Sequence, residues 1–334
     1  MGRLSFNAFV VHENAENKTF DQTIEERAIS DLPDGEVLVR VHYSSLNYKD
    51  ALSATGHKGV TKNYPHIPGI DAAGMVDESD SEQFTTGDKV IITGYDLGMN
   101  TDGGFGEYIR VPAEWIVPLP ETLTLKEAMI YGTAGFTAGL ALHKFQIIEQ
   151  SPELGSIVVT GATGGVGSLA ISLLSRAGFK VHAVTGKPDK EKYLKALGAS
   201  EVLTRNTVHD SSGRGLLSAK WGGAVDAVGG EILSTLLKSV KTGGTVISCG
   251  NAASNSLETT VYPFILRGVN LLGITSAATA MDLRNQIWQQ LATSWKIDQF
   301  ESISKTVRLE ELNREIDRIL AGKQTGRVVL EHNI

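Results

Sequence analysis

A glycine-rich turn between a strand and a helix is the segment of this sequence best suited to hold a charged ligand. The β-branched run Ile157–Thr160 leads directly into the turn 161–167, and apolar residues then recur at helical spacing as far as Ala177. A second strand pattern begins at Val181. This β-α-β unit is typical of a dinucleotide site, in which backbone N–H groups at a helix N-terminus approach a pyrophosphate. The predicted contact residues are Ala162, Thr163, Gly164, Gly165 and Val166.

The turn departs from the usual Gly-x-Gly-x-x-Gly pattern because Ala162 occupies the first glycine position. A tight strand-to-helix turn that binds no ligand is therefore the alternative interpretation. The preceding strand and the apolar face of the following helix favour the dinucleotide site.

The residues after the second strand indicate which dinucleotide is bound. Proteins that select NAD place Asp or Glu there, about 20 residues beyond the turn, to bind the ribose 2′-hydroxyl. Here that position is Thr185, followed by Gly186 and Lys187. A hydroxyl, a backbone N–H and an ammonium attract a 2′-phosphate, whereas a carboxylate repels it. The sequence predicts NADPH. The alternative is that Lys187 and Arg205, which follows the third strand, are ordinary surface charges.

Two kinds of element position these residues. From 125 to 267 strands alternate with helices, which predicts a doubly wound parallel sheet with ligands at the carboxyl ends of its strands. Residues 1–124 instead carry short apolar runs separated by turns, and Val37, Val39 and Val41 share one face of a strand. This pattern predicts an antiparallel, partly barrel-like β domain. We expect residues 268–334 to return to that domain, with the active site in the cleft between the two.

The composition excludes several classes of protein. The net charge of the 334 residues is −7, and no cluster of basic residues indicates a nucleic-acid surface. No apolar run approaches the ~20 residues that span a bilayer, and Met1–Phe6 does not resemble a signal peptide or a myristoylation site. We therefore expect a cytoplasmic protein. Its one cysteine, Cys249, allows neither an intramolecular disulfide nor a zinc site built from cysteines.

Several motifs in register carry a family resemblance that covers nearly the whole chain. They are Ser44–Asp50, Pro68–Gly74, Gly103–Tyr108 and Gly132–Ala138. In this order they resemble the medium-chain dehydrogenase/reductase superfamily, which implies an α/β fold with a Rossmann domain and a GroES-like domain. Leu46–Asp50 together with Thr260–Arg267 resembles the acrylyl-CoA reductase and quinone oxidoreductase subgroup.

Comparison with the zinc alcohol dehydrogenases of this superfamily implies that no metal is used. Those enzymes have Gly-His-Glu where this chain has Gly69-Ile70-Asp71, and they have a cysteine before the aspartate of the first motif. Neither the histidine nor that cysteine is present here, so the family's tetrahedral zinc site cannot be assembled.

The resemblance also implies roles for individual residues. Arg205 matches an arginine that faces the phosphate or adenine, and the residues placed near the nicotinamide are Tyr48, Asn251, Ile265 and Ser276. Asn47 and Tyr48 are candidate donors to a developing oxyanion or to the α-carbon, and Asp50 orients them. The alternative for these three residues is that they only close a turn after a strand.

The implied activity is NADPH-dependent reduction of the C=C bond of a short α,β-unsaturated acyl-CoA. Two alternatives are a quinone or enone reductase and a protein that binds NADPH without catalysis. Lys58 and Lys62 are candidates for contact with the CoA. Glu258–Tyr262 resembles an edge strand that pairs across a two-fold axis, which predicts a homodimer.

Overall fold

The computed structural model describes residues 5–14 and 16–333, and it divides the chain into two compact units. The first unit contains the chain up to Thr133, Ala277–Thr293, and the chain from Phe300 onward. The second contains Ala134–Ser276 and Ser294–Gln299. The sequence prediction set these boundaries at 124 and 268, and its inference about Met1–Leu4 falls outside the described residues. No helix in the described part of the chain is long and apolar enough to cross a membrane.

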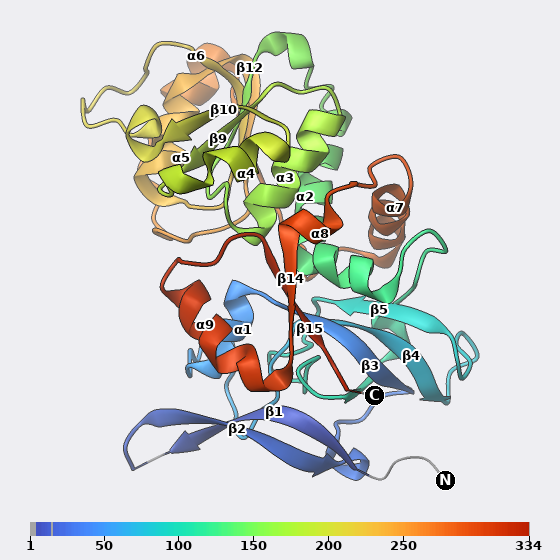
Figure 1. Cartoon of the computed structure of the whole chain (residues 1–334). Helices are drawn as coiled ribbons and strands as arrows, with labels where there is room; N and C mark the ends of the chain where they lie inside the picture. The colour runs from blue at the N-terminus through green and yellow to red at the C-terminus, as the bar shows by residue number, and fades with distance from the viewer. Residues whose placement is uncertain (1–4, 15, 334) are drawn as a thin grey trace. The chain divides into compact units, whose positions relative to one another are not determined.

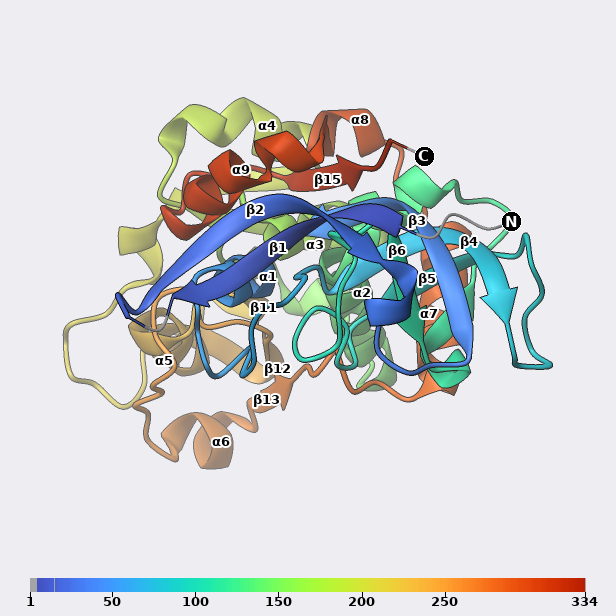
Figure 2. The ribbon, with the colours of Figure 1, turned by 90° about the horizontal axis from the view of Figure 1, so that it is seen from below.

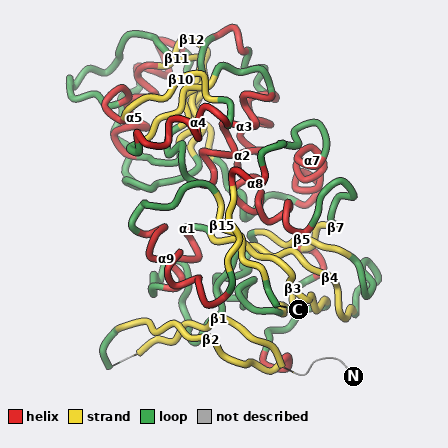
Figure 3. Tube along the Cα trace, viewed as in Figure 1, coloured by secondary structure: helices red, strands yellow, loops and turns green. Residues whose placement is uncertain are grey.

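The first unit is built mainly on antiparallel strands, and its one parallel pair among the described residues is β14 with β15 (Figures 1 and 3). A hairpin joins β1 (Ser5–Asn14) to β2 (Thr19–Ala28), and Figure 2 shows the two strands running together. A seven-stranded sheet has the order β14-β15-β3-β4-β5-β7, with β6 also paired to β3. Its strands are β3 (Val37–Leu46), β4 (Asp71–Ser79), β5 (Lys89–Thr93), β6 (Tyr108–Val111), β7 (Ile116–Pro118), β14 (Ser304–Val307) and β15 (Arg327–Glu331).

Both faces of this sheet are covered. The alternation predicted for β3 is observed, since Val37, Val39 and Val41 are buried in one apolar cluster, whereas Leu38 is buried in another. Helices α1 (Tyr48–Ala54) and α9 (Leu312–Leu320) contribute to the second cluster and lie side by side (Figure 1). Helices α7 (Met281–Ala292) and α8 (Phe300–Ile303) also belong to this unit, and α2 (Leu125–Ile147) begins in it and continues into the second unit.

The second unit is a doubly wound sheet of six parallel strands in the order β10-β9-β8-β11-β12-β13. Numbered from β8, this is the order 3-2-1-4-5-6 of dinucleotide-binding Rossmann folds. The strands are β8 (Ile157–Val159), β9 (Val181–Thr185), β10 (Ala199–Thr204), β11 (Trp221–Asp226), β12 (Val240–Ser248) and β13 (Asn270–Gly273). The helices are α3 (Gly165–Arg176), α4 (Glu191–Ala196), α5 (Gly230–Ser239) and α6 (Tyr262–Arg267).

Two segments differ from the sequence expectation. The final strand of the parallel sheet, β13, lies beyond residue 267, where the prediction ended the second domain. Residues 258–262, expected as an edge strand, form no strand within the chain: residues 258–261 lie outside regular strands and helices, and Tyr262 opens α6. A strand of that kind needs a pairing partner, which a single chain does not supply there.

Candidate functional site

The glycine turn of the second unit places an uncapped helix N-terminus beside the sheet. Gly161 has φ +58°, which reverses the chain after β8, and the Gly164 N–H donates to the Gly161 carbonyl at 2.8 Å. Gly164 is the N-cap of α3, and no side chain accepts a hydrogen bond from the first turn. The N–H groups at the start of α3 are thus available to an anion.

Close packing explains the third glycine of the motif. A Cβ on Gly167 would lie 2.4 Å from the Gly161 carbonyl oxygen and 2.8 Å from Cα of Ala162. Any other residue would push α3 away from the turn. The hydroxyl of Ser168 donates to the Ala162 carbonyl at 3.2 Å, and Tyr193 donates to that hydroxyl at 3.0 Å. These hydrogen bonds to Ser168 and Tyr193 fix the conformation of the glycine turn.

The carboxyl ends of β9 and β10 bring together the residues predicted to select the cofactor. Lys187 donates its N–H to the Thr185 hydroxyl at 3.0 Å, and Thr185 pairs in register with Thr204. A Cβ on Gly186 would lie 2.8 to 2.9 Å from three guanidinium-side atoms of Arg205. The structure thus places Arg205 directly against the Gly186 backbone. None of the four predicted residues is a carboxylate, so this edge fits a phosphate monoester.

The remaining predicted cofactor residues divide between the two edges of the sheet. Asn251 follows β12 and Ser276 follows β13, so both are at the carboxyl edge with the glycine turn. Ile265 is not. It lies in α6, which precedes β13, and its neighbour Arg267 donates to carbonyls of Lys238 and Val240 at the amino edge. The assignment of Ile265 to the nicotinamide stays a prediction from the resemblance.

In the first unit, the segment after β3 carries the three predicted catalytic residues. Asn47 is the N-cap of α1, Tyr48 opens that helix with 45% of its surface exposed, and Asp50 is fully buried. The Asn47 N–H donates to Asp50 Oδ2 at 2.7 Å. Of the three residues, Tyr48 is exposed, Asn47 is partly buried and Asp50 is closed to solvent.

The Asn47 amide is fully used inside the protein. Its Nδ2 donates to Asp71 Oδ2 at 2.8 Å and to the Ser45 carbonyl at 3.1 Å. Its Oδ1 accepts from Arg327 Nη1 at 3.2 Å. Both amide hydrogens are therefore committed, and the geometry favours a holding role for Asn47 over donation to a substrate.

Asp50 is held by backbone donors in a dry site. Besides the Asn47 N–H, it accepts the Ile70 N–H at 2.8 Å. Burial, and next the charge of Asp71, raise the pKa of Asp50 to about 7, against an ordinary value of 3.8. This carboxyl ties the start of α1 to the segment before β4.

This shift predicts the pH dependence of stability. Between pH 3.8 and about 7 the folded chain keeps a proton on Asp50 that the unfolded chain has lost, so this group's contribution to stability declines as pH rises. We expect the free energy of unfolding of the wild type, relative to Asp50→Asn, to fall between pH 5 and pH 8. Urea unfolding at four pH values measures this difference. A difference that is constant or rises with pH would contradict the assignment.

Sequence reasoning assigned no role to Asp71 or Arg327, although Asp71 stands in the motif Pro68–Gly74 used for the resemblance. Asp71 opens β4 and Arg327 opens β15, and both are buried. Their facing atoms, Asp71 Oδ2 and Arg327 Nη2, are 3.8 Å apart. The two residues are far apart in the sequence, so no local pattern links them. A buried Arg needs a carboxylate partner, but this partner can be identified only from the sheet order β15-β3-β4.

Other candidate groups have structural partners. Lys58 forms an ion pair with Glu13 at 2.7 Å and lies 4.8 Å from the ring centroid of Tyr64, so its charge is already used. Cys249 donates its thiol to the Asp226 carbonyl at 3.3 Å, and burial raises the pKa of this thiol to about 12. Such a thiol is a poor nucleophile.

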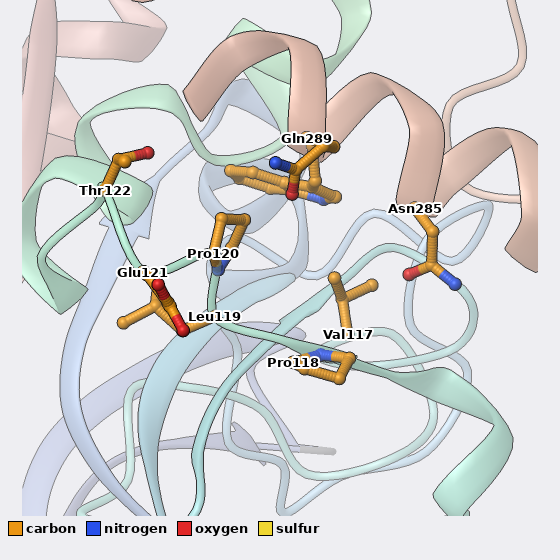
Figure 4. A pocket seen from close by; sticks show the side chains of 9 residues that line it. Val117, Pro118, Leu119, Pro120, Glu121, Thr122, Asn285 and Gln289 are labelled. Atoms are coloured by element: carbon orange, nitrogen blue, oxygen red, sulfur yellow. The ribbon is translucent and has the colours of Figure 1, made fainter. Parts of the chain in front are cut away.

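A cavity of about 500 Å³ in the first unit contains none of the predicted site residues (Figure 4). It lies between α7 and the segment that follows β7. Its lining residues are Val117, Pro118, Leu119, Pro120, Glu121, Thr122, Asn285, Trp288 and Gln289.

Comparison with known proteins agrees with this architecture. Residues 33–121 match the family model of the alcohol dehydrogenase GroES-like domain, and residues 165–293 match that of the zinc-binding dehydrogenases. A Bacillus subtilis protein named "Putative quinone oxidoreductase YhfP" is 46% identical over 329 residues, 98% of each chain. The acrylyl-CoA reductase AcuI of Ruegeria pomeroyi is 42% identical over 328 residues, 98% of this chain and 99% of its own.

Solved structures show the same relationship. The crystal structure of Bacillus subtilis yhfP with NAD bound has a TM-score of 0.95 at 44% identity, covering 99% of this chain and 100% of that one. The yhdH oxidoreductase from Salmonella enterica in complex with NADP has a TM-score of 0.94 at 38% identity, covering 98% and 100%. The chain belongs to the medium-chain dehydrogenase/reductase superfamily, in the group of acrylyl-CoA reductases and quinone oxidoreductases, and is an oxidoreductase. The fold and the family predicted from the sequence are confirmed.

The name of the second family model raises the question of zinc. The donor set of this chain does not fit a zinc site of that kind, because Ile70 occupies the position of the histidine and Cys249 is the only thiol. Within the described ranges, no three His, Cys, Asp or Glu residues lie together as a metal site.

Proposed function

We propose that this oxidoreductase uses NADPH to reduce the C=C bond of a short α,β-unsaturated acyl-CoA. The observation that carries the cofactor choice is that Thr185 stands at the end of β9, where NAD-selective proteins have an acid, with Arg205 against the adjacent Gly186. Relatives crystallised with NADP or NADPH support it, as does the 42% identical acrylyl-CoA reductase. The NAD-bound yhfP structure makes the choice between the two cofactors worth measuring.

In this proposal the second unit holds and orients the cofactor. The start of α3, from Ala162 to Val166, binds the pyrophosphate through backbone N–H groups. Thr185, Gly186, Lys187 and Arg205 bind the 2′-phosphate, and Asn251 and Ser276 lie toward the nicotinamide. When bound, NADPH supplies the hydride that adds to the β-carbon of the substrate. The protein's own groups need only fix geometry and balance charge.

Tyr48 performs the chemical work that remains for the protein. Hydride addition at the β-carbon leaves negative charge on the thioester oxygen, and a proton must then reach the α-carbon. A phenol at the exposed start of α1 can donate a hydrogen bond to that oxygen or deliver the proton. Asn47 and Asp50 hold the phenol in place.

Quinone reduction is the second candidate, and the name of the 46% identical relative favours it. A single screen separates the two activities. NADPH oxidation is followed with acrylyl-CoA, crotonyl-CoA and a simple benzoquinone at matched concentrations. We expect kcat/KM for acrylyl-CoA to exceed that for the quinone at least tenfold. A preference for the quinone would reject the acyl-CoA assignment.

We also propose that the protein is a cytoplasmic homodimer formed through the segment around α6. Five exposed apolar side chains lie within ten residues of one another, and a strand formed by residues 258–262 would find its partner in a second copy. The five are Leu257, Val261, Tyr262, Ile265 and Leu266.

Light scattering at micromolar concentration tests the dimer. We expect the wild type to have twice the mass of the chain, and Val261→Asp with Ile265→Asp to have the mass of one chain. Ile147→Asp is the matched control, because Ile147 is equally exposed but lies at the end of α2 (Leu125–Ile147). A monomeric wild type would reject this interface.

A further inference from the structure

The Asp71 carboxylate collects donors from two segments that flank the candidate site. It accepts the Ser45 hydroxyl at 2.6 Å and the Asn47 amide at 2.8 Å, both from the end of β3. It also accepts the Thr133 hydroxyl at 2.6 Å and the Thr133 N–H at 2.9 Å. The carboxylate is fully buried, and these four hydrogen bonds take up about all of its acceptor sites.

Arg327 completes the arrangement from the other side. Its guanidinium donates to Asn47 Oδ1 at 3.2 Å, to the Ser45 hydroxyl at 2.7 Å and to the Ile130 carbonyl at 3.0 Å. Both ends of the Asn47 amide are therefore hydrogen-bonded, the nitrogen to Asp71 and the oxygen to Arg327. Replacing a buried ion pair by two apolar side chains of similar volume commonly costs no stability. The Asp71–Arg327 pair is therefore better explained by the orientation that it imposes on Asn47 than by a gain in stability.

Gly132 lies against the Asp71–Arg327 pair, where there is no room for a side chain. It interrupts α2 with φ +49° and ψ −156°. A Cβ there would lie 2.5 Å from Asp71 Oδ2, 2.6 Å from the Ser45 hydroxyl and 2.8 Å from Arg327 Nη2. The irregular backbone of α2 therefore occurs at the position where any side chain would collide with Asp71 and Arg327.

We propose that Asp71 and Arg327 are positioning residues that act on the reaction through Asn47 and Tyr48. They fix both ends of the Asn47 amide, and the backbone of Asn47 leads directly into Tyr48. Asp71 is 0% and Arg327 2% exposed, so both charged groups are closed off from solvent. This inference rests on the proposed function, because it assigns to Tyr48 the donation described there.

A double-mutant cycle tests the coupling. Asp71→Asn is expected to lower kcat at least 20-fold while KM for NADPH stays within threefold, and Arg327→Lys is expected to fall between it and the wild type. In the Tyr48→Phe background, Asp71→Asn should lower kcat less than threefold further, because the group it positions is gone. A merely structural role would produce the same factor in both backgrounds, and that result would overturn the proposal.

Hydrogen exchange provides a readout that needs no substrate. Asp71→Asn should speed exchange of the amides of Asp50 and Ala51, in the first turn of α1, at least tenfold. Glu315→Gln is the control, since Glu315 is a buried carboxylate of α9 paired with Lys305 and Arg318. It should leave those amides unchanged. Unchanged exchange in Asp71→Asn would overturn the positioning role. An inactive wild type with the expected exchange would overturn only the proposed function.

Discussion

The double substitution Lys187→Ala with Arg205→Ala is expected to weaken NADPH binding about 100-fold or more and to change NADH binding less than threefold. Each removes a cation from the edge where Thr185 and Gly186 end β9. Losing one charge-assisted contact costs about 1.5–3 kcal/mol, and two such losses correspond to a factor of at least 100 in the dissociation constant. Titration followed by cofactor fluorescence measures both constants.

A matched control separates a specific contact from a general loss of positive charge. Lys192 is exposed in α4, a few residues along the chain from the proposed phosphate site. Lys192→Ala should leave both dissociation constants within twofold of the wild type. If the double variant binds NADPH within twofold of the wild type, the 2′-phosphate lies elsewhere.

Tyr48→Phe is expected to lower kcat with the enoyl-thioester about 100-fold, with NADPH affinity changed only a few-fold. The substitution removes one hydroxyl from the exposed start of α1 and leaves the ring that packs there. Oxyanion donors and general acids are each worth about 100-fold or more in rate. Pre-steady-state NADPH oxidation measures the chemical step directly.

Tyr43→Phe provides the comparison for this variant. Tyr43 is also partly exposed, and its hydroxyl donates to Glu331 at 2.9 Å, so the change deletes one hydrogen bond elsewhere in the first unit. We expect wild-type turnover from it. Turnover of Tyr48→Phe equal to that of Tyr43→Phe would remove Tyr48 from the mechanism and make backbone or water the donor.

Local patterns in the sequence predicted the second unit well. The β-branched run of β8, the glycines after it and the apolar spacing of α3 lie within about 30 residues of one another, the usual span of a βαβ unit. The short strand β13 was missed as part of the parallel sheet, because a four-residue strand carries little periodic signal and its neighbour β12 precedes it by more than twenty residues.

The candidate site was less accessible to sequence reasoning. A motif resemblance singled out Asn47 and Asp50 as polar residues after a strand, but their partners Asp71 and Arg327 come from strands that only the folded sheet brings alongside β3. The role of Ile265 near the nicotinamide came from a motif resemblance alone and stays a prediction. Only the order of strands shows that α6 approaches β13 from the amino edge.

The most direct test is titration of the unmodified protein with NADPH and with NADH under the same conditions. The account predicts that NADPH binds at least tenfold more tightly than NADH. Lys187 and Arg205 bind its 2′-phosphate, and the position of the acid that would bind the ribose 2′-hydroxyl of NADH is occupied by Thr185. Equal affinities, or tighter binding of NADH, would contradict it.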